Sequence, residues 1–460
     1  MPRFRPVAAG VAVVLLCTAP TALHAQDLPR PTSANAPADS LVLADAVALA
    51  LAASPDLAAL GFEATAREAL VRQAGRRPNP TIGLDTENLL APTGGDGDNA
   101  AQTTLSASLP LEFGGRRASR IRLAEAERDG LAPEVDAARR GVVARVTARF
   151  AAAVASQERA RLARATVALA AEARSTVAQQ VELGDRSPID ETRAGVALAR
   201  VQAEAARAER TREGALRSLA ALWDASAAPP VAVDGALVLP PLPPFGVLVA
   251  RLDATPELAR VAAEAVRREA AVEAARAGRS YLPTVSAGLR GFHGGGGGTA
   301  GFGLVAGVSV PLPVYSRGGD ALAAAEARRA GIDAERAAAR ARLTADLADA
   351  YGRLAAARDA AAVLADTAVP GAEAAAAAVT EGYGLGAFTV LDVLDAQRAV
   401  ADVRGLLLDA LAEAAAAQAD VERVAGGALI APPGTAPGTS DGVPRLPTPD
   451  STPLVPTPDR

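Results

Sequence analysis

The sequence is poor in the residues on which most enzymes and metal sites depend. Its 460 residues include two histidines, one cysteine and no lysine, and only 3% are aromatic. Cys17 and His24 lie near the N-terminus, and His293 stands before a run of glycines. This set cannot supply a histidine-based catalytic triad or a multi-histidine metal site. We therefore expect no enzyme activity, no cofactor and no resident metal.

The charged residues exclude a nucleic-acid partner. All 47 basic residues are arginines, they stand against 52 acidic residues, and the net charge is -5. Most arginines are interspersed with glutamates, as on solvated helix faces, and form no basic patch. Alanine is abundant while aromatic residues are few, which disfavours a thick globular core and favours long, closely packed helices.

The N-terminus predicts export. Arg3 and Arg5 precede the apolar run Val7–Leu16, and small residues follow as far as Ala25, so residues 1–25 are predicted to be a cleaved signal peptide. Lipidation of Cys17 is the rival interpretation, but a leucine occupies the preceding position, where a small residue is expected.

No later segment approaches 18 consecutive apolar residues, so we expect no helical membrane anchor. The mature chain is then either soluble in an exported compartment or crosses a membrane by β-strands. Residues 427–460 are rich in proline and threonine and are predicted to be a disordered tail.

The sequence contains an internal duplication of one structural unit. "SPDLAALGFEATAREALVRQAGRRPNPT" returns as "TPELARVAAEAVRREAAVEAARAGRSYLPT", "SLPLEFGGRR" returns as "SVPLPVYSRGGD", and "LGDRSPIDETR" returns as "LGAFTVLDVLD". The first repeat covers residues 26–228 and the second covers 253–426. A proline-rich linker, residues 229–252, joins them.

Each repeat has the same predicted plan: an opening helix, a pair of strands and a long antiparallel helical hairpin. Prolines end the opening helices, and Pro133 and Pro370 should kink or break the long helices. The first opening helix is predicted over about Leu41–Arg76. The remaining predicted ranges are the second opening helix 254–279, the strand pairs about 81–112 and 284–310, and the hairpins about 116–223 and 318–424.

The four strands alternate apolar residues with small or polar ones, which suits strands that meet different media on their two faces. Four short strands cannot close a membrane barrel, because the smallest barrels need about eight. Three chains would supply twelve. The predicted fold class is α+β. In this prediction the strands of three chains form one barrel, and the long helices extend that barrel as a tube. This arrangement indicates a conduit more than a catalyst.

Two hairpin turns carry polar residues that demand an explanation. Ser187 with Asp190, and Thr389 with Asp392, fit the pattern of a residue that caps a helix and an acid three positions later. Capping does not explain Asp395, which lies beyond that pattern and has Arg193 as its equivalent in the first repeat. The glycines Gly184, Gly384 and Gly386 are predicted to form the turns.

The order of these segments resembles the outer-membrane efflux protein family, the TolC-like channels, over about residues 44–426. The motifs "LPLEFGGRR" and "GYGLGAFTVLDVLDAQR" carry the resemblance, and "LEFGGRR" is most similar to the heavy-metal cation (CzcC-like) branch. The resemblance implies a homotrimer with a twelve-stranded outer-membrane barrel and a helical periplasmic tunnel. It also implies two partners, a periplasmic adaptor and an inner-membrane pump.

The resemblance further implies a gate at the periplasmic end of the second hairpin. Asp392 and Asp395 match residues that form an acidic ring in the family, and Tyr383 matches a position that helps to hold the channel closed. Asp190 occupies the position in the first repeat that is equivalent to Asp392. Phe388 stands where well-studied members have arginine, so a charged latch is not expected there. The alternative function is a soluble periplasmic coiled-coil adaptor or scaffold without a pore. Metal ions, drugs, dyes and polypeptides all remain open as cargo.

Overall fold

The computed structural model describes residues 40–87, 101–223, 229–238, 242–292 and 301–429. These residues belong to one compact unit that begins at Asp39. The predicted signal peptide, almost all of the predicted tail and both glycine-rich segments between paired strands lie outside the described residues, as do Cys17, His24 and His293.

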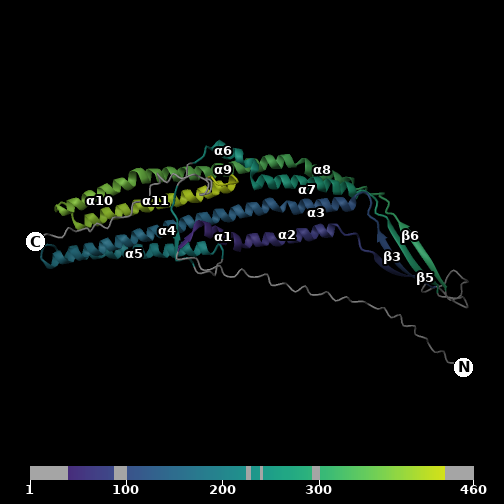
Figure 1. Ribbon diagram of the computed structural model, residues 1–460, viewed down its shortest axis with the longest axis horizontal. Coiled ribbons are helices and arrows are strands. Elements are labelled where there is room, and N and C mark those ends of the chain that lie inside the picture. The colour runs from purple at the N-terminus through teal and green to yellow at the C-terminus, as the bar shows by residue number, and fades with distance from the viewer. Residues whose placement is uncertain (1–39, 88–100, 224–228, 239–241, 293–300, 430–460) are drawn as a thin grey trace, which may run out of the picture. The chain divides into compact units, whose positions relative to one another are not determined.

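Four strands form one antiparallel sheet (Figure 1). They are β2 (Thr81–Glu87), β3 (Gln102–Pro110), β5 (Thr284–Phe292) and β6 (Gly301–Ser309), and they lie side by side in the order β2-β3-β5-β6. Each strand lies inside a segment that the alternating pattern predicted. The described sheet is open, because β2 and β6 each have one edge without a partner strand.

The two faces of the sheet differ in polarity. A row of four leucines crosses all four strands on one face, and each member is more than half exposed: Leu84, Leu105, Leu289 and Leu304. The opposite face carries small and polar residues, among which Arg290 donates from Nε to Thr104 Oγ1 at 3.0 Å. This separation is the pattern expected of a sheet with lipid on one side and water on the other.

Long helices follow each pair of strands. In the first repeat they are α3 (Arg116–Asp129), α4 (Leu131–Glu182) and α5 (Pro188–Ala220). In the second they are α8 (Gly319–Ala330), α9 (Ile332–Val363), α10 (Val369–Gly384) and α11 (Val390–Val424). With 52 residues, α4 extends about 80 Å at 1.5 Å per residue.

The interruptions fall where the backbone loses hydrogen bonds. A π-helical turn, Leu364–Ala368, ends two residues before Pro370, in agreement with the predicted break. In the first repeat the break lies at Gly130 and not at Pro133 itself. Proline has no N–H and leaves the carbonyl four residues earlier without its helical bond, so Pro133 is compatible with a break one turn before it. Gly331 interrupts the second repeat at the equivalent place without a proline.

The two repeats are joined through their long helices. Helix α4 packs against α5 on one side and α11 on the other, and α11 also packs against α9 and α10. Much of this interface is alanine, which lets helix backbones approach closely, and larger anchors such as Phe150 and Leu347 fill two clusters. One cluster belongs mainly to the first repeat and the other to the second.

The opening helix of the first repeat departs from the prediction. The segment predicted as one helix from Leu41 instead begins with β1 (Ser40–Val42) and is broken into α1 (Leu43–Ala53) and α2 (Pro55–Ala74). Ser54 caps α2 by accepting a bond from the N–H of Leu57 at 3.4 Å, and Pro55 occupies the first helical position.

The proline-rich linker also contains regular structure that its composition did not predict. Strand β4 (Ala232–Asp234) pairs in parallel with β1, and Gln157 of α4 bonds to the backbone of Val233 through both ends of its amide. The linker continues into α6 (Phe245–Arg251), a short 3-10 turn and α7 (Pro256–Gly278). Through Val233 the linker joins the apolar cluster of the first repeat, and through Leu248 and Leu252 it joins that of the second.

Arginine–carboxylate pairs connect neighbouring helices. Arg268 of α7 binds Glu335 of α9 at 2.8 Å and also donates to the carbonyl of Arg328 at 2.7 Å. On α7 itself, a hydrogen bond from Arg267 lowers the pKa of Glu264 to about 2. The planar guanidinium can bond to two acceptors at once, a geometry that lysine does not offer.

By length and composition alone, one helical stretch in the described part of the chain, Gly319–Gly384, is apolar enough to cross a membrane. Alanines supply much of its hydropathy, and the stretch packs along α11 through α9 and α10.

Candidate functional site: the two hairpin tips

Each helical hairpin ends in a turn, and the two turns occupy equivalent positions in the two repeats. The first tip, residues 183–193, joins α4 to α5, and the second tip, residues 385–395, joins α10 to α11. Gly184 and Gly386 adopt φ of 83° and 77°, a left-handed conformation that favours glycine over other residues. These two glycines carry the turns. Gly384 was also predicted as a turn residue, but it is the last residue of α10.

The second tip begins α11 with a reciprocal capping box. Thr389 Oγ1 accepts a bond from the N–H of Asp392 at 3.3 Å, and the N–H of Thr389 donates to Asp392 Oδ2 at 2.7 Å. The threonine hydroxyl also donates to that carboxylate at 2.7 Å. These bonds, first the one from the hydroxyl, lower the pKa of Asp392 because they favour its charged form. The capping role predicted for Thr389 and Asp392 is confirmed.

The first tip uses its acid differently. Ser187 caps α5 by accepting a bond from the N–H of Ile189 at 3.4 Å, so its predicted capping role is confirmed. Asp190 does not complete a box, and instead its carboxylate lies 3.7 Å from Arg193 Nη1. Residues 183–193 carry three acids and two arginines, a net charge of -1, whereas residues 385–395 carry two acids and no base, a net charge of -2. The first tip is therefore the less negative of the two.

Asp395 is the unpaired acid of the second tip. Its side chain is exposed, and within the residues that the structure describes it has no hydrogen bond or ion pair. It occupies the position of Arg193, one turn beyond the capping acid. The replacement of a cation by a carboxylate at this position is the main electrostatic difference between the tips.

Both tips share one apolar cluster. Val177 of α4, Ala194 of α5 and Val390 of α11 are buried together, and Tyr383 of α10 packs against them half-buried. Phe388 covers the backbone of α10 so closely that a Cβ on Gly382 would lie 2.5 Å from its ring. The structure therefore brings Tyr383, Asp190 and Asp392 into one region, in which movement of one hairpin end would disturb the other.

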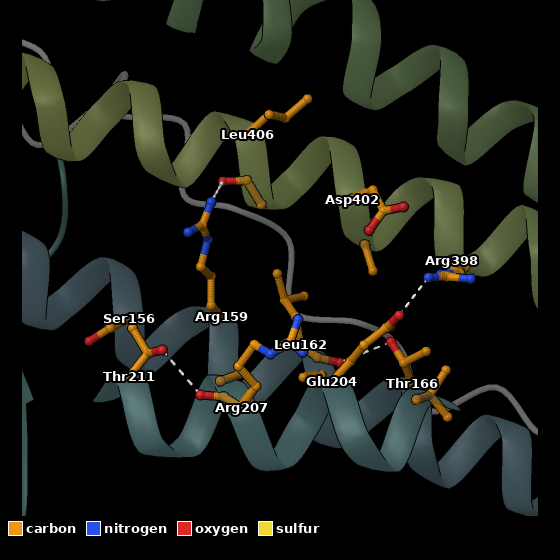
Figure 2. A pocket seen from close by; sticks show the side chains of 15 residues that line it. Ser156, Arg159, Leu162, Thr166, Glu204, Arg207, Thr211, Arg398, Asp402 and Leu406 are labelled. Atoms are coloured by element: carbon orange, nitrogen blue, oxygen red, sulfur yellow. Dashed lines mark hydrogen bonds and ion pairs between the residues drawn. The ribbon is translucent and has the colours of Figure 1, made fainter. Parts of the chain in front are cut away.

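A polar groove of about 430 Å³ lies along α4 between α5 and α11 (Figure 2). Arg398 of α11 reaches across to Glu204 of α5 with a separation of 2.6 Å, and Arg159 of α4 donates to the carbonyl of Gly405 at 2.9 Å. These arginines connect the two repeats beyond the tips. The sequence analysis missed them because the partners lie 194 and 246 residues apart, and no local pattern pairs them.

Comparisons with known proteins identify the family. The family described as "Outer membrane efflux protein" matches residues 46–225 and 247–427. The cobalt-zinc-cadmium resistance protein CzcC of Cupriavidus metallidurans is 32% identical over 390 residues, which cover 85% of this chain and 91% of the relative. The chain belongs to the outer membrane efflux protein family. As a member it is an outer-membrane efflux channel with a periplasmic extension.

Solved structures show the same fold for this outer membrane efflux protein. A membrane protein from Pseudomonas aeruginosa has a TM-score of 0.67 at 21% identity, and the match covers 84% of this chain and 90% of that chain. The open state of the MtrE outer-membrane channel of Neisseria gonorrhoeae has a TM-score of 0.64 at 19% identity, with 84% and 89% covered. The family assignment does not favour the alternative of a soluble adaptor without a pore.

The described residues of this efflux protein contain no group of three or more His, Cys, Asp or Glu side chains that could hold a metal ion.

Proposed function

We propose that three copies of this chain form the outer-membrane exit duct of a tripartite pump that expels divalent metal cations. The observation that carries the proposal is the open sheet. Its apolar face is exposed, and neither outer strand has a partner along its far edge within the described chain. Three copies arranged around an axis would close these edges into a twelve-stranded barrel.

Transport through such a duct is passive. The chain offers no nucleotide-binding motif, and the energy would come from an inner-membrane pump to which a periplasmic adaptor connects the channel. The cargo is inferred from the relative at 32% identity, whose name assigns it cobalt, zinc and cadmium resistance. Zinc, cobalt and cadmium ions are all divalent cations, and an acidic constriction suits them by charge.

The gate of this duct is proposed to lie at the second tip, with Asp395 as its leading residue. Three copies of an exposed, unpaired carboxylate near a threefold axis would form a ring that attracts cations. Asp392 contributes to the same ring and also caps α11 with its carboxylate. Tyr383 helps to hold the tips together. Asp190 is expected to contribute less, since Arg193 lies beside it.

Single-channel recording of the purified protein in planar bilayers tests this assignment. We expect Asp395→Ala to reduce the preference for cations over anions, and the block by divalent cations, several-fold, in keeping with the loss of a charged ring. Asp190→Ala is the matched control and should change both much less. If Asp395→Ala conducts like the unaltered channel while Asp392→Ala changes selectivity and block, the leading role belongs to Asp392.

A deletion strain tests the cargo. Loss of this chain should increase sensitivity to zinc, cobalt and cadmium, and the intact gene should restore resistance. If sensitivity instead rises only for dyes and antibiotics, the channel assignment would stand and the metal cargo would be wrong.

A further inference from the structure

An ion pair fills the space between the end of α2 and the segment that follows β3 in the first repeat. Arg120 of α3 binds the carboxylate of Glu112 through both Nη atoms, at 2.5 and 3.2 Å. Arg120 also donates to the carbonyls of Ala74 and Arg76 at the end of α2. The side chain of Glu112 is only 12% exposed, so the first repeat closes this space with its own residues.

The second repeat lacks both members of this pair. "LPLE" matches "VPLP", which makes Pro313 equivalent to Glu112. Counted back from the helical interruption that both repeats share, Ala321 is equivalent to Arg120. Neither proline nor alanine can form an ion pair, so the equivalent space in the second repeat is not closed in this way.

An open hollow of about 750 Å³ lies at this place, between the end of α7 and the segment that follows β6. Three arginines and several apolar or aromatic side chains line it, and the lining contains no acidic residue among the described ones. The main lining residues are Arg276, Arg279, Arg317, Tyr281, Leu312 and Val314.

Two of the three arginines have no acidic partner. Arg276 lies 3.6 Å from a carboxylate oxygen of Glu326. Arg279 donates from Nε to the carbonyl of Arg317 at 3.2 Å, and neither of these two forms an ion pair with a carboxylate in the part of the chain that the structure describes. Both are exposed. The hollow therefore presents positive charge that the protein does not compensate.

The hollow lies at the boundary between membrane and water. It adjoins the end of the sheet from which α7 and α8 extend (Figure 1), and this end faces the periplasm because the helices form the periplasmic extension of the channel. Tyr281 and Tyr315, two of the four tyrosines of the chain, are exposed at this level. Exposed aromatic side chains are typical of both boundaries of an outer-membrane barrel.

One wall of the hollow continues the apolar face of the sheet. Val308 near the end of β6 belongs to that face, and Val310, Leu312 and Val314 follow at alternate positions. Each of the four side chains is at least 45% exposed. A molecule in the hollow would therefore meet the lipid-facing surface on one side and arginines on the other. This combination suits a ligand with apolar chains and an anionic headgroup.

We propose that the hollow binds the anionic headgroup of a phospholipid in the periplasmic leaflet of the outer membrane. The guanidinium groups of Arg279 and Arg317 donate to the phosphate oxygens, a contact for which their planar geometry is well suited. The acyl chains lie along Leu312 and Val310. The first repeat has no such site, because Glu112 and Arg120 occupy the equivalent space. The proposal goes beyond the proposed duct and requires only that the sheet lies in the membrane.

Native mass spectrometry of the full-length channel in detergent tests the site. Phosphatidylglycerol is the anionic probe, and phosphatidylcholine is the reference without net charge. We expect phosphatidylglycerol to remain bound at lower lipid concentration than phosphatidylcholine. An excess of inorganic phosphate should not displace it, because phosphate lacks the chains that contact the apolar wall. Equal binding of the two lipids, or complete displacement by phosphate, would overturn the assignment to an anionic lipid.

Removal of the unpaired arginines should weaken the binding. Arg279→Gln with Arg317→Gln should reduce the affinity for phosphatidylglycerol on the order of tenfold. The matched control is Arg76→Gln with Arg77→Gln, which removes two arginines from the same end of the sheet in the first repeat. The control should have little effect. An equal loss in both double variants would show general attraction to a basic surface and would overturn the site.

Transfer of the ion pair from the first repeat separates the shape of the site from its charge. Pro313→Glu with Ala321→Arg adds one acid and one base, so the net charge is unchanged while the hollow is filled. Binding of phosphatidylglycerol should fall to that of phosphatidylcholine, and conductance in planar bilayers should persist. Undiminished binding in this variant, with unchanged circular dichroism, would overturn the proposal. If this variant does not fold, the comparison of the two arginine variants decides.

Discussion

In the first tip Asp190 lies beside Arg193, whereas in the second tip Asp392 closes a capping box and Asp395 is left without a partner. The turns themselves are alike, since Gly184 and Gly386 have nearly the same φ. The duplication therefore kept the backbone and changed the electrostatics. In the first tip Arg193 lies beside the acid, and in the second tip the residue at the position of that arginine is an acid with no partner among the described residues.

Substitution of the glycine in either turn should have the largest effect on stability, because both turns have the same left-handed backbone. Gly184→Ala and Gly386→Ala should each reduce the free energy of unfolding of the tip by about 1 to 2 kcal/mol, because a left-handed backbone is strained for residues with a Cβ. Thermal unfolding in detergent and hydrogen exchange at the tips would measure it. Gly384→Ala is the control, since this residue is helical and nothing lies near an added Cβ. A clear loss at only one of the two turns would contradict their equivalence.

The caps should differ in strength. Thr389→Ala removes a residue that is bonded to Asp392 in both directions, so we expect a loss of about 1 kcal/mol. Ser187→Ala removes a single bond and should cost about 0.5 kcal/mol. Hydrogen exchange of the first turns of α11 and α5 would report each cap separately. A larger loss for Ser187→Ala would show that the reciprocal box adds nothing.

Arg193→Asp makes the first tip resemble the second. The ion pair is exposed, so the free energy of unfolding should change by less than about 1 kcal/mol. The channel should nevertheless become more selective for cations, since a carboxylate replaces a cation in each copy. Reversal potentials in a salt gradient would detect this change, and Arg193→Gln separates the loss of the cation from the gain of the acid. Unchanged selectivity in both variants would remove the first tip from the conduction path.

Acid should weaken the cap of the second tip. The pKa of Asp392 is lowered in the folded state by its bonds to Thr389. Its contribution to stability is therefore present above the pKa of the unfolded chain and is lost as pH falls through the lowered value. Hydrogen exchange of α11 across the acidic range would follow the loss, which should be small because the group is exposed. Thr389→Ala should abolish this pH dependence, and its persistence would assign the effect to another acid.

The tips could be located from the sequence because their signals are local. A glycine in the turn, a serine or threonine cap and an acid three residues later stand within about ten residues of each other, and the strands have an equally local alternation. The same reasoning treated Asp190 and Asp392 alike. It failed for Asp190 because Arg193 competes for the carboxylate, and side-chain geometry decides between two such partners.

The sequence by itself determined the duplication, the four strands and the helical hairpins, since each depends on spacing within a short segment. Only the tertiary structure decided the β1–β4 pairing, the break at Ser54 and the contact of Arg398 with Glu204. Those features join segments far apart in the chain. Their free energy depends on burial and geometry that the folded helices create, and no local pattern encodes it.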